Sequence, residues 1–410
     1  MTGPMDLPSL IFALLAGTLF GATLVGLLTC KVKWMAPFAV LCIALLASAV
    51  VLVYLMPSGD RWLAAILVAI AGIIGYAFTT LWFLSGDRPR EMPSLVDNPP
   101  SNPGHLAVVY FSHGESEEYD QLAWLHQFRE FDHQKLKFMP RLARPFFFTV
   151  LRSKYMKGSS RHCSMHCQMM AKLEEDYRKD GLSDVRFYLS FLDAEPRPDV
   201  AAAKAFNDGA KTIVVANVFL TVSNHTAEGD ELVEKMHLEG RGVRVLYTEP
   251  LWNSAQLRHS FIEKANLVIP PEERATTGVL LVGHGQPDEW DVEFATETEH
   301  ENRFREQLRD DFVHEGYKPE NVRLAWMAFK EPNTTDAVNS LAASGIKKMI
   351  FFSAAISADG IHSQSDIPEL VEKAKASKQV EVIDLGAWND HPLVIKAIRE
   401  KIEAALGKAG

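Results

Sequence analysis

The first fifth of the chain consists of three long apolar stretches separated by short polar connections. The stretches cover residues 7–29, 35–56 and 62–84, and none of them contains a charged side chain. Each is close to the ~20 residues that a helix needs to cross the ~30 Å hydrocarbon core of a bilayer. A cleaved signal peptide fits poorly, because no basic residue precedes the first stretch and two further stretches follow it. The pattern predicts three transmembrane helices within residues 1–86, with a buried helical hairpin as the alternative.

Basic residues indicate how these predicted helices lie in the membrane. Lys31 and Lys33 follow the first stretch and Arg88 and Arg90 follow the third, whereas the connection before the third stretch carries only Arg61. Cytoplasmic loops of membrane proteins carry an excess of lysine and arginine. We therefore expect an integral protein of the cell inner membrane, with the amino terminus outside and the large carboxyl-terminal part in the cytoplasm.

The remainder of the sequence contains a repeat. The dipeptides Glu-Pro, at 195 and 331, and Trp-Asn, at 252 and 388, each recur after 136 residues. The run GAKTIVV from Gly209 matches GIKKMIF from Gly345 with the same spacing, and ELVEK from Glu231 returns at Glu369. Because these matches keep one order and nearly one offset, the sequence indicates two homologous units.

Each repeat alternates short apolar runs, which are typical of buried strands, with helical patterns. Such alternation predicts a parallel sheet with helices on both faces. The fold class is therefore α/β, with two duplicated Rossmann-like units preceded by a three-helix transmembrane anchor. We expect a proline-rich linker over 87–104, an N-terminal unit over 105–265 with an insertion at about 121–157, and a C-terminal unit over 275–410. The strands are expected at 106–111, 185–189, 212–218 and 243–247, and at 278–282, 322–327, 348–352 and 380–385.

A histidine followed by glycine ends the first predicted strand of each unit, at His113 and His284, and a second histidine follows each third strand, at His225 and His362. Ligands of such folds bind outside the carboxyl ends of the strands. Both imidazoles of a unit therefore face one site if its first and third strands are neighbours. Neutral imidazoles are good ligands for borderline divalent metals and also accept protons near pH 7. A strand-end histidine often only caps a turn, but a pair in each unit favours a metal site.

Four runs of the C-terminal unit carry a family resemblance: LLVGHG, EPNTTDAVNSLAASGIKKMIFFSAAIS, GIHSQSDIPELVEK and LGAWNDHPLVIKAIREKI. They resemble the class II tetrapyrrole chelatases, which include the ferrochelatases and the sirohydrochlorin and cobalt chelatases. The resemblance implies a chelatase-type fold for both units and places the family's metal-binding histidines at His284 and His362. The His-Gly and His-x-x-x-Asp-Ile-Pro motifs are most similar to the small cobaltochelatase type. Ferrochelatases carry a glutamate-rich segment where this chain has His362.

The resemblance also implies roles for the histidines. His284 is expected to act as base and metal contact, with His362 as its partner. His113 and His225 would form either a second metal site or a vestige of one.

The insertion in the N-terminal unit contains FMPRLARPFFFTVLRSKYMKGSS, which resembles the lip that ferrochelatases place over the porphyrin. Phe146 and Phe147 would offer an apolar surface to the macrocycle, and Arg141 and Arg144 would bind its carboxylates. The alternative is a helix packed on the membrane surface close to the anchor. Both interpretations can hold together.

A second cluster of metal-ligating residue types follows, at His162, Cys163, His166 and Cys167. On a helix the two histidines share one face and the two cysteines share the next. The cluster is an auxiliary metal-site candidate. It also opens a helix that a chelatase has in any case, and a spacing of four is not a zinc-knuckle signature.

Composition and missing motifs exclude several classes of function. The net charge of −10 argues against a nucleic-acid partner, and four cysteines in 410 residues do not make a disulfide framework. The sequence has no G-x-S-x-G elbow, no Walker A motif and no G-x-G-x-x-G after a strand.

The sequence therefore predicts a membrane-anchored chelatase of the lyase class, which inserts Fe²⁺ or Co²⁺ into a porphyrin or sirohydrochlorin. We expect no permanently bound cofactor, since the metal is a substrate. The expected partners are the tetrapyrrole, the membrane and other enzymes of tetrapyrrole synthesis. The alternative is a non-catalytic carrier of metal or tetrapyrrole at the membrane.

Overall fold

The computed structural model describes residues 7–86, 91–97, 99, 104–133, 135, 139–375 and 380–407. The chain divides into two compact units. The helical unit comprises Met1–Arg90 with Glu118–Gly158, and the α/β unit comprises Glu91–Glu117 with Ser159–Gly410. The predicted linker over 87–104 lies partly outside the described residues.

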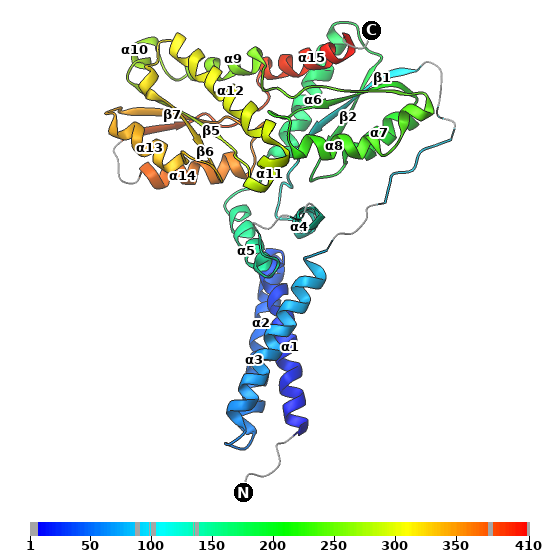
Figure 1. Cartoon of the computed structure of the whole chain (residues 1–410), viewed down its shortest axis with the longest axis vertical. Helices are drawn as coiled ribbons and strands as arrows, with labels where there is room; N and C mark the ends of the chain where they lie inside the picture. Colours follow the sequence, from blue (N-terminus) through cyan, green and yellow to red (C-terminus); the bar gives the residue numbers. More distant parts are fainter. Residues whose placement is uncertain are drawn as a thin grey trace. The chain divides into compact units, whose positions relative to one another are not determined.

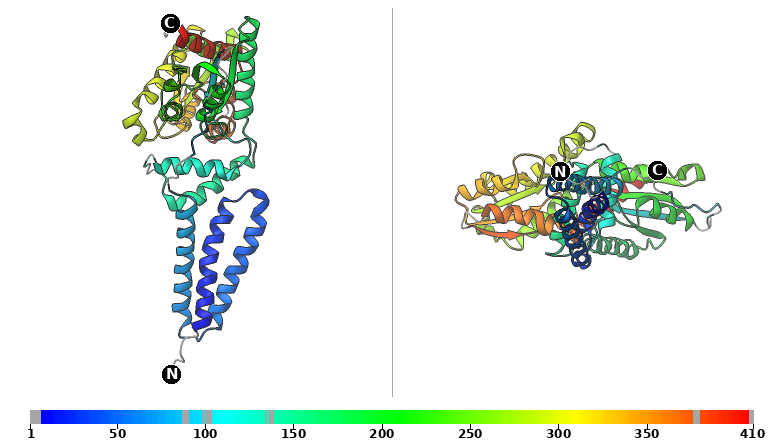
Figure 2. Two further views of the ribbon diagram at one scale, coloured as in Figure 1. Left: turned by 90° about the vertical axis from the view of Figure 1, so that its right-hand side faces the viewer. Right: turned by 90° about the horizontal axis from the view of Figure 1, so that it is seen from below.

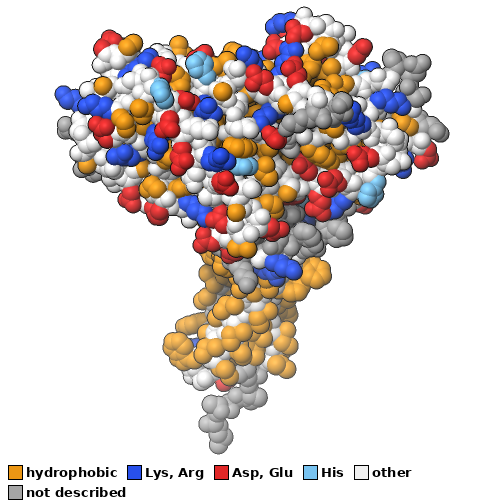
Figure 3. Space-filling model, turned by 45° about the horizontal axis from the view of Figure 1, so that its top comes forward, with side chains coloured by type: hydrophobic (Ala, Val, Ile, Leu, Met, Phe, Trp, Pro, Cys, Tyr) orange, Lys and Arg blue, Asp and Glu red, His pale blue; other side chains and the backbone are white. Residues whose placement is uncertain are grey.

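Three apolar helices form most of the helical unit: α1 (Leu7–Thr29), α2 (Met35–Leu55) and α3 (Arg61–Phe83), with the short η1 (Val32–Trp34) after the first. All three spans are long and apolar enough to cross a membrane, and hydrophobic side chains dominate their surface (Figure 3). Glycines let α1 and α3 approach closely, because a Cβ at Gly21 or Gly75 would collide with the backbone of the other helix. The helices begin and end within a residue or two of the predicted stretches.

The segment predicted as an insertion at about 121–157 groups with the three apolar helices in the helical unit. It forms α4 (Gln121–His133), η2 (Arg141–Ala143) and α5 (Arg144–Tyr155). Its buried side chains Phe128, Phe148 and Leu151 share one apolar core with Val25 of α1 and Leu84 after α3. The segment therefore packs on the end of the helical bundle where α1 and α3 terminate (Figure 2).

The α/β unit contains two four-stranded parallel sheets with the same topology, β2-β1-β3-β4 and β6-β5-β7-β8 (Figure 1). In each sheet the first strand pairs with the third, which is the condition for both imidazoles of a unit to face one site: Leu281 aligns with Phe352, and Val109 with Val215. The N-terminal half runs through β1 (His105–Ser112), α6 (His162–Lys179), β2 (Val185–Phe191), α7 (Pro198–Asn207), β3 (Ala210–Asn217), α8 (Asn224–Glu234), η3 (Leu238–Arg241), β4 (Arg244–Tyr247) and α9 (Ala255–Asn266). The C-terminal half runs through α10 (Pro271–Arg274), β5 (Thr277–Gly283), α11 (Asp288–Glu293), α12 (Ala295–His314), η4 (Pro319–Asn321), β6 (Val322–Trp326), α13 (Thr334–Ala343), β7 (Lys348–Ser353), a π-helical turn (His362–Asp366), α14 (Ile367–Lys375), β8 (Glu381–Asp384) and α15 (Pro392–Gly407).

The two sheets share one apolar core. Met169 of α6, Phe261 of α9, Phe304 of α12 and Ile398 of α15 are buried in a single cluster with residues of both sheets. The outer face of each sheet has its own cluster, under α7 and α8 in the first half and under α13 and α14 in the second. Because the inner core is common, the strand ends of the two halves are held in one rigid arrangement.

Candidate active site

Two histidines of the C-terminal half meet at the carboxyl ends of neighbouring strands. His284 directly follows β5, and His362 begins the π-helical turn that leads into α14. Their ring centroids lie 5.2 Å apart, with the ring planes at 73°. Single π-helical turns inside helices occur frequently at functional sites. The structure thus brings together the two residues that the sequence assigned to metal binding.

In each imidazole Nδ1 faces a hydrogen-bond acceptor, and this contact determines which ring nitrogen carries the lone pair. Nδ1 of His284 lies 2.6 Å from the carbonyl oxygen of Gly285, and Nδ1 of His362 lies 2.7 Å from Oδ2 of Asp366. Both partners are acceptors, so the neutral tautomer carries its proton on Nδ1. The lone pair of each ring is then on Nε2, the arrangement that metal-ligating histidines commonly have.

Burial keeps one member of this pair neutral. Burial, with a smaller contribution from the neighbouring His362, lowers the pKa of His284 to about 4. At pH 7 its Nε2 is therefore unprotonated and available as a ligand. An imidazole with so low a pKa holds a proton poorly, so it passes any proton it accepts to another group.

A buried carboxylate supports the turn that carries His284. The backbone N–H of His284 donates to Oε1 of Glu301, whose side chain is buried on α12. Burial raises the pKa of Glu301, while the charge of Arg305 one turn later acts in the opposite direction. Gly283 is required here, because a Cβ at this position would collide with Glu301 and Arg305. Glu301 thus fixes the backbone of the turn that carries His284.

The N-terminal half has a similar pair with a different acid partner. The ring centroids of His113 and His225 lie 4.8 Å apart. Nδ1 of His113 faces the carbonyl oxygen of Gly114 at 2.8 Å, and its Nε2 lies 3.2 Å from Oδ2 of Asp193. The N-terminal pair therefore has its aspartate on the histidine after the first strand, whereas the C-terminal pair has it on the histidine after the third.

His225 lies in the first turn of α8, which starts at a capping box formed by Ser223 and Thr226. Burial, with smaller contributions from His113 and His284, lowers the pKa of His225 well below its usual value. The influence of His284 indicates that the two histidine pairs lie close to one another.

The auxiliary cluster on α6 is divided between two environments. His166 is fully buried and satisfied: Nδ1 lies 2.8 Å from the hydroxyl of Tyr110 and Nε2 3.0 Å from the hydroxyl of Ser357. Cys163 donates to the carbonyl oxygen of Glu115 at 3.0 Å. Burial raises the pKa of Cys163 to about 11, so it is a thiol at pH 7 and not the thiolate that binds metals.

Only His162 of this cluster approaches a histidine pair. Its ring centroid lies 6.3 Å from that of His113 and 4.6 Å from that of His166. Its Nδ1 is buried without a hydrogen-bond partner. Cys167 is exposed on the next face of the helix. Within the described part of the chain, no group of three or more His, Cys, Asp or Glu side chains is arranged to hold a metal ion.

The residues proposed for the substrate lip all lie in the helical unit. Arg144 is 1% exposed and bonds both carboxylate oxygens of Asp132 at 2.8 Å, so its guanidinium is committed to structure. Arg141 also contacts Asp132, at 2.9 Å, but is half exposed. Phe147 packs against Phe128, whereas the ring of Phe146 is exposed. Of these four residues, Arg144 is buried, Phe147 is partly buried, and Arg141 and Phe146 are exposed.

Residues of the N-terminal half hold the loop that carries His362. The carboxylate of Glu115 accepts a hydrogen bond from the N–H of Ile361 at 3.0 Å and another from the hydroxyl of Ser160 at 2.9 Å. The N–H of Arg161 donates to Oε1 of Gln364 at 3.2 Å. The pair of His284 and His362 is therefore positioned partly by residues of the N-terminal half that follow His113 in the chain.

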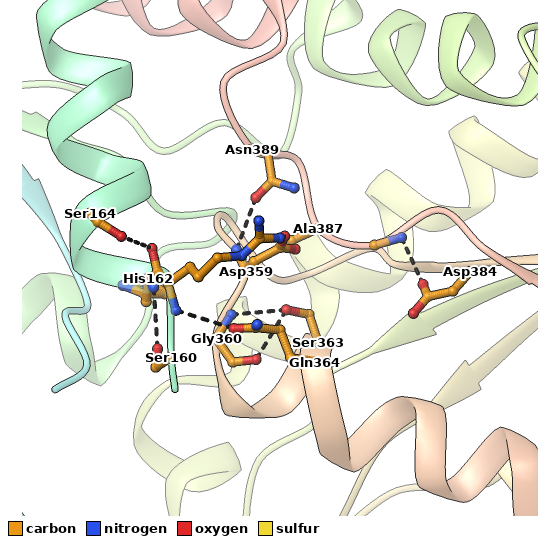
Figure 4. Close-up of polar contacts among 12 residues, drawn as sticks. Ser160, His162, Ser164, Asp359, Gly360, Ser363, Gln364, Asp384, Ala387 and Asn389 are labelled. Atoms are coloured by element: carbon orange, nitrogen blue, oxygen red, sulfur yellow. Dashed lines mark hydrogen bonds and ion pairs between the residues drawn. The ribbon is translucent and has the colours of Figure 1, made fainter. Parts of the chain in front are cut away.

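Contacts within the C-terminal half fix the same loop (Figure 4). The N–H of Gly360 donates to the hydroxyl of Ser363 at 3.0 Å, and the N–H of Asp359 donates to Oδ1 of Asn389 at 2.9 Å. Asp359 also forms an ion pair with Arg161. The loop before His362 is thus held from both halves.

Sequence reasoning missed four acidic residues that orient the site: Glu115, Asp193, Glu301 and Asp366. Asp366 had a signal, because a residue four positions after His362 on a helix shares its face. Glu301 lies at a buried position of α12, and a glutamate is almost never fully buried without a partner for its carboxylate. Nothing in the local pattern indicated Glu115 or Asp193, since both act on partners brought near by the fold.

A family model described as CbiX matches residues 278–405. No curated protein matches the chain significantly. Among solved structures, the chain is similar to the sirohydrochlorin chelatase SirB from Bacillus subtilis subspecies spizizenii in complex with cobalt, with 15% identity and a TM-score of 0.46 over 75% of this chain and 97% of that one. It is also similar to SirB from Bacillus subtilis with Fe³⁺ (17% identity, TM-score 0.49, 75% and 98% covered). A third is CbiX, the terminal enzyme for biosynthesis of siroheme in denitrifying bacteria (14%, 0.40, 73% and 99%). Because these TM-scores are below 0.5, the family assignment rests on the sequence match of residues 278–405.

Proposed function

We propose that the chain is a membrane-anchored lyase of the class II tetrapyrrole chelatase family, which inserts Fe²⁺ or Co²⁺ into a tetrapyrrole. The match of residues 278–405 to the CbiX family model supports this proposal. The metal and the macrocycle are both substrates, and no permanently bound cofactor is needed. The observation that carries the proposal is the pair His284 and His362, whose ring centroids lie 5.2 Å apart and whose Nδ1 atoms both face acceptors.

This pair suits the delivery of a divalent metal. Two neutral imidazoles offer two Nε2 lone pairs, which bind Fe²⁺ or Co²⁺ well without the charge of a carboxylate. His284 and His362 therefore act as metal ligands before insertion.

Insertion releases two pyrrole protons for each metal ion bound. As the metal moves from an imidazole to the macrocycle, the freed Nε2 becomes able to accept one of these protons. In His362 the contact of Nδ1 with Oδ2 of Asp366 at 2.7 Å leaves Nε2 as the atom that accepts the proton. His284, with a pKa lowered to about 4, passes its proton on to solvent.

The macrocycle we propose first is of the sirohydrochlorin type, with a porphyrin as the second choice. His362 stands where the resemblance places a glutamate-rich segment in ferrochelatases, and the C-terminal motifs are most similar to small cobaltochelatases. The CbiX match of residues 278–405 supports the same choice.

The three apolar helices support an anchor in the cell inner membrane. Lys31 and Lys33 follow α1 and Arg88 and Arg90 follow α3, whereas the connection before α3 carries only Arg61. We therefore propose that the amino terminus is outside and the α/β unit is cytoplasmic. Other enzymes of tetrapyrrole synthesis are the partners we propose for this location.

A carrier of metal or tetrapyrrole is the second candidate, favoured by the presence of two histidine pairs in one α/β unit. The full chain in lipid nanodiscs, supplied without oxygen with Co²⁺ or Fe²⁺ and with sirohydrochlorin or a porphyrin, separates the two. An enzyme gives metallated product in excess over protein. The absorption change of the macrocycle measures this product. Binding that stops at one equivalent, with no released product, would contradict catalysis and support the carrier.

A further inference from the structure

The end of α1 is capped by side chains of α5. The guanidinium of Arg152 donates to the carbonyl oxygens of Leu27 at 3.1 Å and Cys30 at 2.7 Å, and the hydroxyl of Thr149 donates to the carbonyl oxygen of Leu28 at 3.0 Å. The last carbonyls of a helix have no partner within it, and a cation is favourable at this end of the helix dipole. α5 is therefore fastened to the point where the first apolar helix ends.

The segment after α3 is held in the same way. Arg144 donates to the carbonyl oxygen of Leu84 at 2.6 Å, and Asp132 balances its charge. Asp132 also accepts a hydrogen bond from the N–H of Gly86 at 2.8 Å. Both ends of α5 thus lie at the boundary where apolar helices give way to polar chain.

The start of α5 lies beside the last turns of α3. The hydroxyl of Tyr76 donates to the carbonyl oxygen of Leu142 at 2.8 Å, and the rings of Tyr76 and Phe146 have centroids 6.3 Å apart. Tyr76 is seven residues before Phe83, where α3 ends. At 1.5 Å per residue the backbone of Tyr76 lies roughly 10 Å inside the end of the third apolar helix, and its side chain reaches Leu142 from there.

One side of this segment exposes a stripe of large apolar side chains. Leu142, Phe146 and Val150 follow one another at intervals of four, and each exposes about half of its surface: 48%, 57% and 51%. The opposite side is buried through Phe148 and Leu151. We call Leu142, Phe146 and Val150 the apolar stripe.

We propose that the apolar stripe is a lipid-binding surface, which inserts into the boundary between the headgroups and the acyl chains of the bilayer. The proposal rests on the membrane anchor of the proposed function. It follows from the depth of the Tyr76 contact and from the caps on α1 and α3, which fix the stripe beside the ends of the predicted spans. The exposed Lys31 and Lys33, directly after α1, suit the anionic headgroups at the same level.

The occupant is phospholipid and not a second protein, because Phe146 of the stripe lies beside Tyr76 of α3, with ring centroids 6.3 Å apart, and the surface of the three helices is apolar. An amphipathic helix at this level lies in the plane of the interface. The segment would then limit how far the anchor tilts and how far it moves along the membrane normal.

Photo-crosslinking of the full chain in nanodiscs of phosphatidylcholine and phosphatidylglycerol tests the proposal. The residue p-benzoyl-phenylalanine is placed at Phe146, with matched probes at Ile43, which is 68% exposed on α2, and at Leu267, which is 83% exposed in the α/β unit. After irradiation, mass spectrometry of the peptides identifies what each probe has captured. We expect phospholipid adducts at positions 43 and 146 and none at 267.

Two results would overturn the proposal, and they differ in what else they affect. If position 43 captures lipid but position 146 captures a second copy, another protein or nothing, the stripe does not bind lipid and the anchor stands. If neither position captures lipid, the membrane anchor itself fails and the stripe with it.

Discussion

Replacing Asp366 with asparagine removes the charge behind His362 while keeping the side chain nearly the same size. Oδ2 of Asp366 lies 2.7 Å from Nδ1 of His362, and the aspartate side chain is only 16% exposed. The contact fixes the tautomer that leaves the lone pair on Nε2. Loss of such a partner behind a metal-ligating histidine typically costs 10- to 100-fold in metal affinity or activity, or about 1.4 to 2.7 kcal/mol.

The amide of asparagine can also donate to Nδ1. The imidazole proton would then move to Nε2, and the ligand atom would be lost to the metal. We therefore expect the Kd of the Asp366→Asn chain for Co²⁺ to rise by about 10- to 100-fold and kcat to fall over the same range.

Competition titration with Co²⁺ under anaerobic conditions measures the affinity, and metallation of the macrocycle measures kcat. Asp310→Asn is the matched control, since Asp310 lies on the surface of α12 beside Arg309 with its side chain 59% exposed. An Asp366→Asn chain that binds Co²⁺ and turns over like the Asp310→Asn control would refute the role assigned to the aspartate.

Three further predictions concern the supports of the site and the anchor. Asp132→Asn leaves Arg144 buried without its counter-charge, which typically costs about 3 to 5 kcal/mol; hydrogen–deuterium exchange of the α5 peptides should accelerate strongly, and unchanged protection would contradict the pairing. Glu115→Ala removes the acceptor of the loop before His362, so Co²⁺ affinity should fall by about tenfold while the unfolding midpoint stays close to that of the native chain; equal affinity would show that the loop holds itself. His113→Ala should retain at least half of the turnover if the C-terminal pair is the working site, and complete loss of metallated product would assign the reaction to the N-terminal pair.

The ion pair of Asp132 and Arg144 also links the stability of the helical unit to pH. Burial opposes the charge on Asp132, but hydrogen bonds from Arg144, from the N–H of Gly86 and from Arg141 outweigh it and lower the pKa to about 2. A lowered carboxyl pKa stabilises the folded state above the usual value of 3.8, and this contribution is lost as the pH falls towards 2. Protection of α5 in the native chain should therefore decrease below pH 4, whereas the Asp132→Asn chain should show no such decrease.

Local patterns were sufficient to predict the α/β architecture. The run GVLLV gave a strand at 278–282, and the structure has β5 at Thr277–Gly283. A continuous apolar run is consistent with a buried strand, and its short length and flanking glycine favour a strand over a helix. The repeat indicated that the second sheet follows the first. The pairing of His284 with His362 was implied by the family resemblance and depended on the first and third strands being neighbours, as β5 and β7 are.

The supports of the site could not be predicted because they depend on contacts across the fold. Glu115 and Ile361 are separated by 246 positions, and neither belongs to a pattern that names the other. The arginines of α5 show the same limit. Arg144 was expected to bind a carboxylate of the substrate, and it does bind a carboxylate, but that of Asp132. Residue type predicted the chemistry, while the partner is a carboxylate of α4 in the same insertion.

Metallation by the His284→Ala chain, beside the native chain and His113→Ala, tests the central claim most directly. Full-length proteins in nanodiscs receive Co²⁺ and sirohydrochlorin without oxygen, and the rate of product formation is followed by absorbance. Because His284 supplies one of the two Nε2 ligands, we expect its removal to reduce the rate by at least about 100-fold while His113→Ala stays active. A His284→Ala chain that forms metallated product at the native rate would contradict the assignment of this histidine pair as the site of metal insertion.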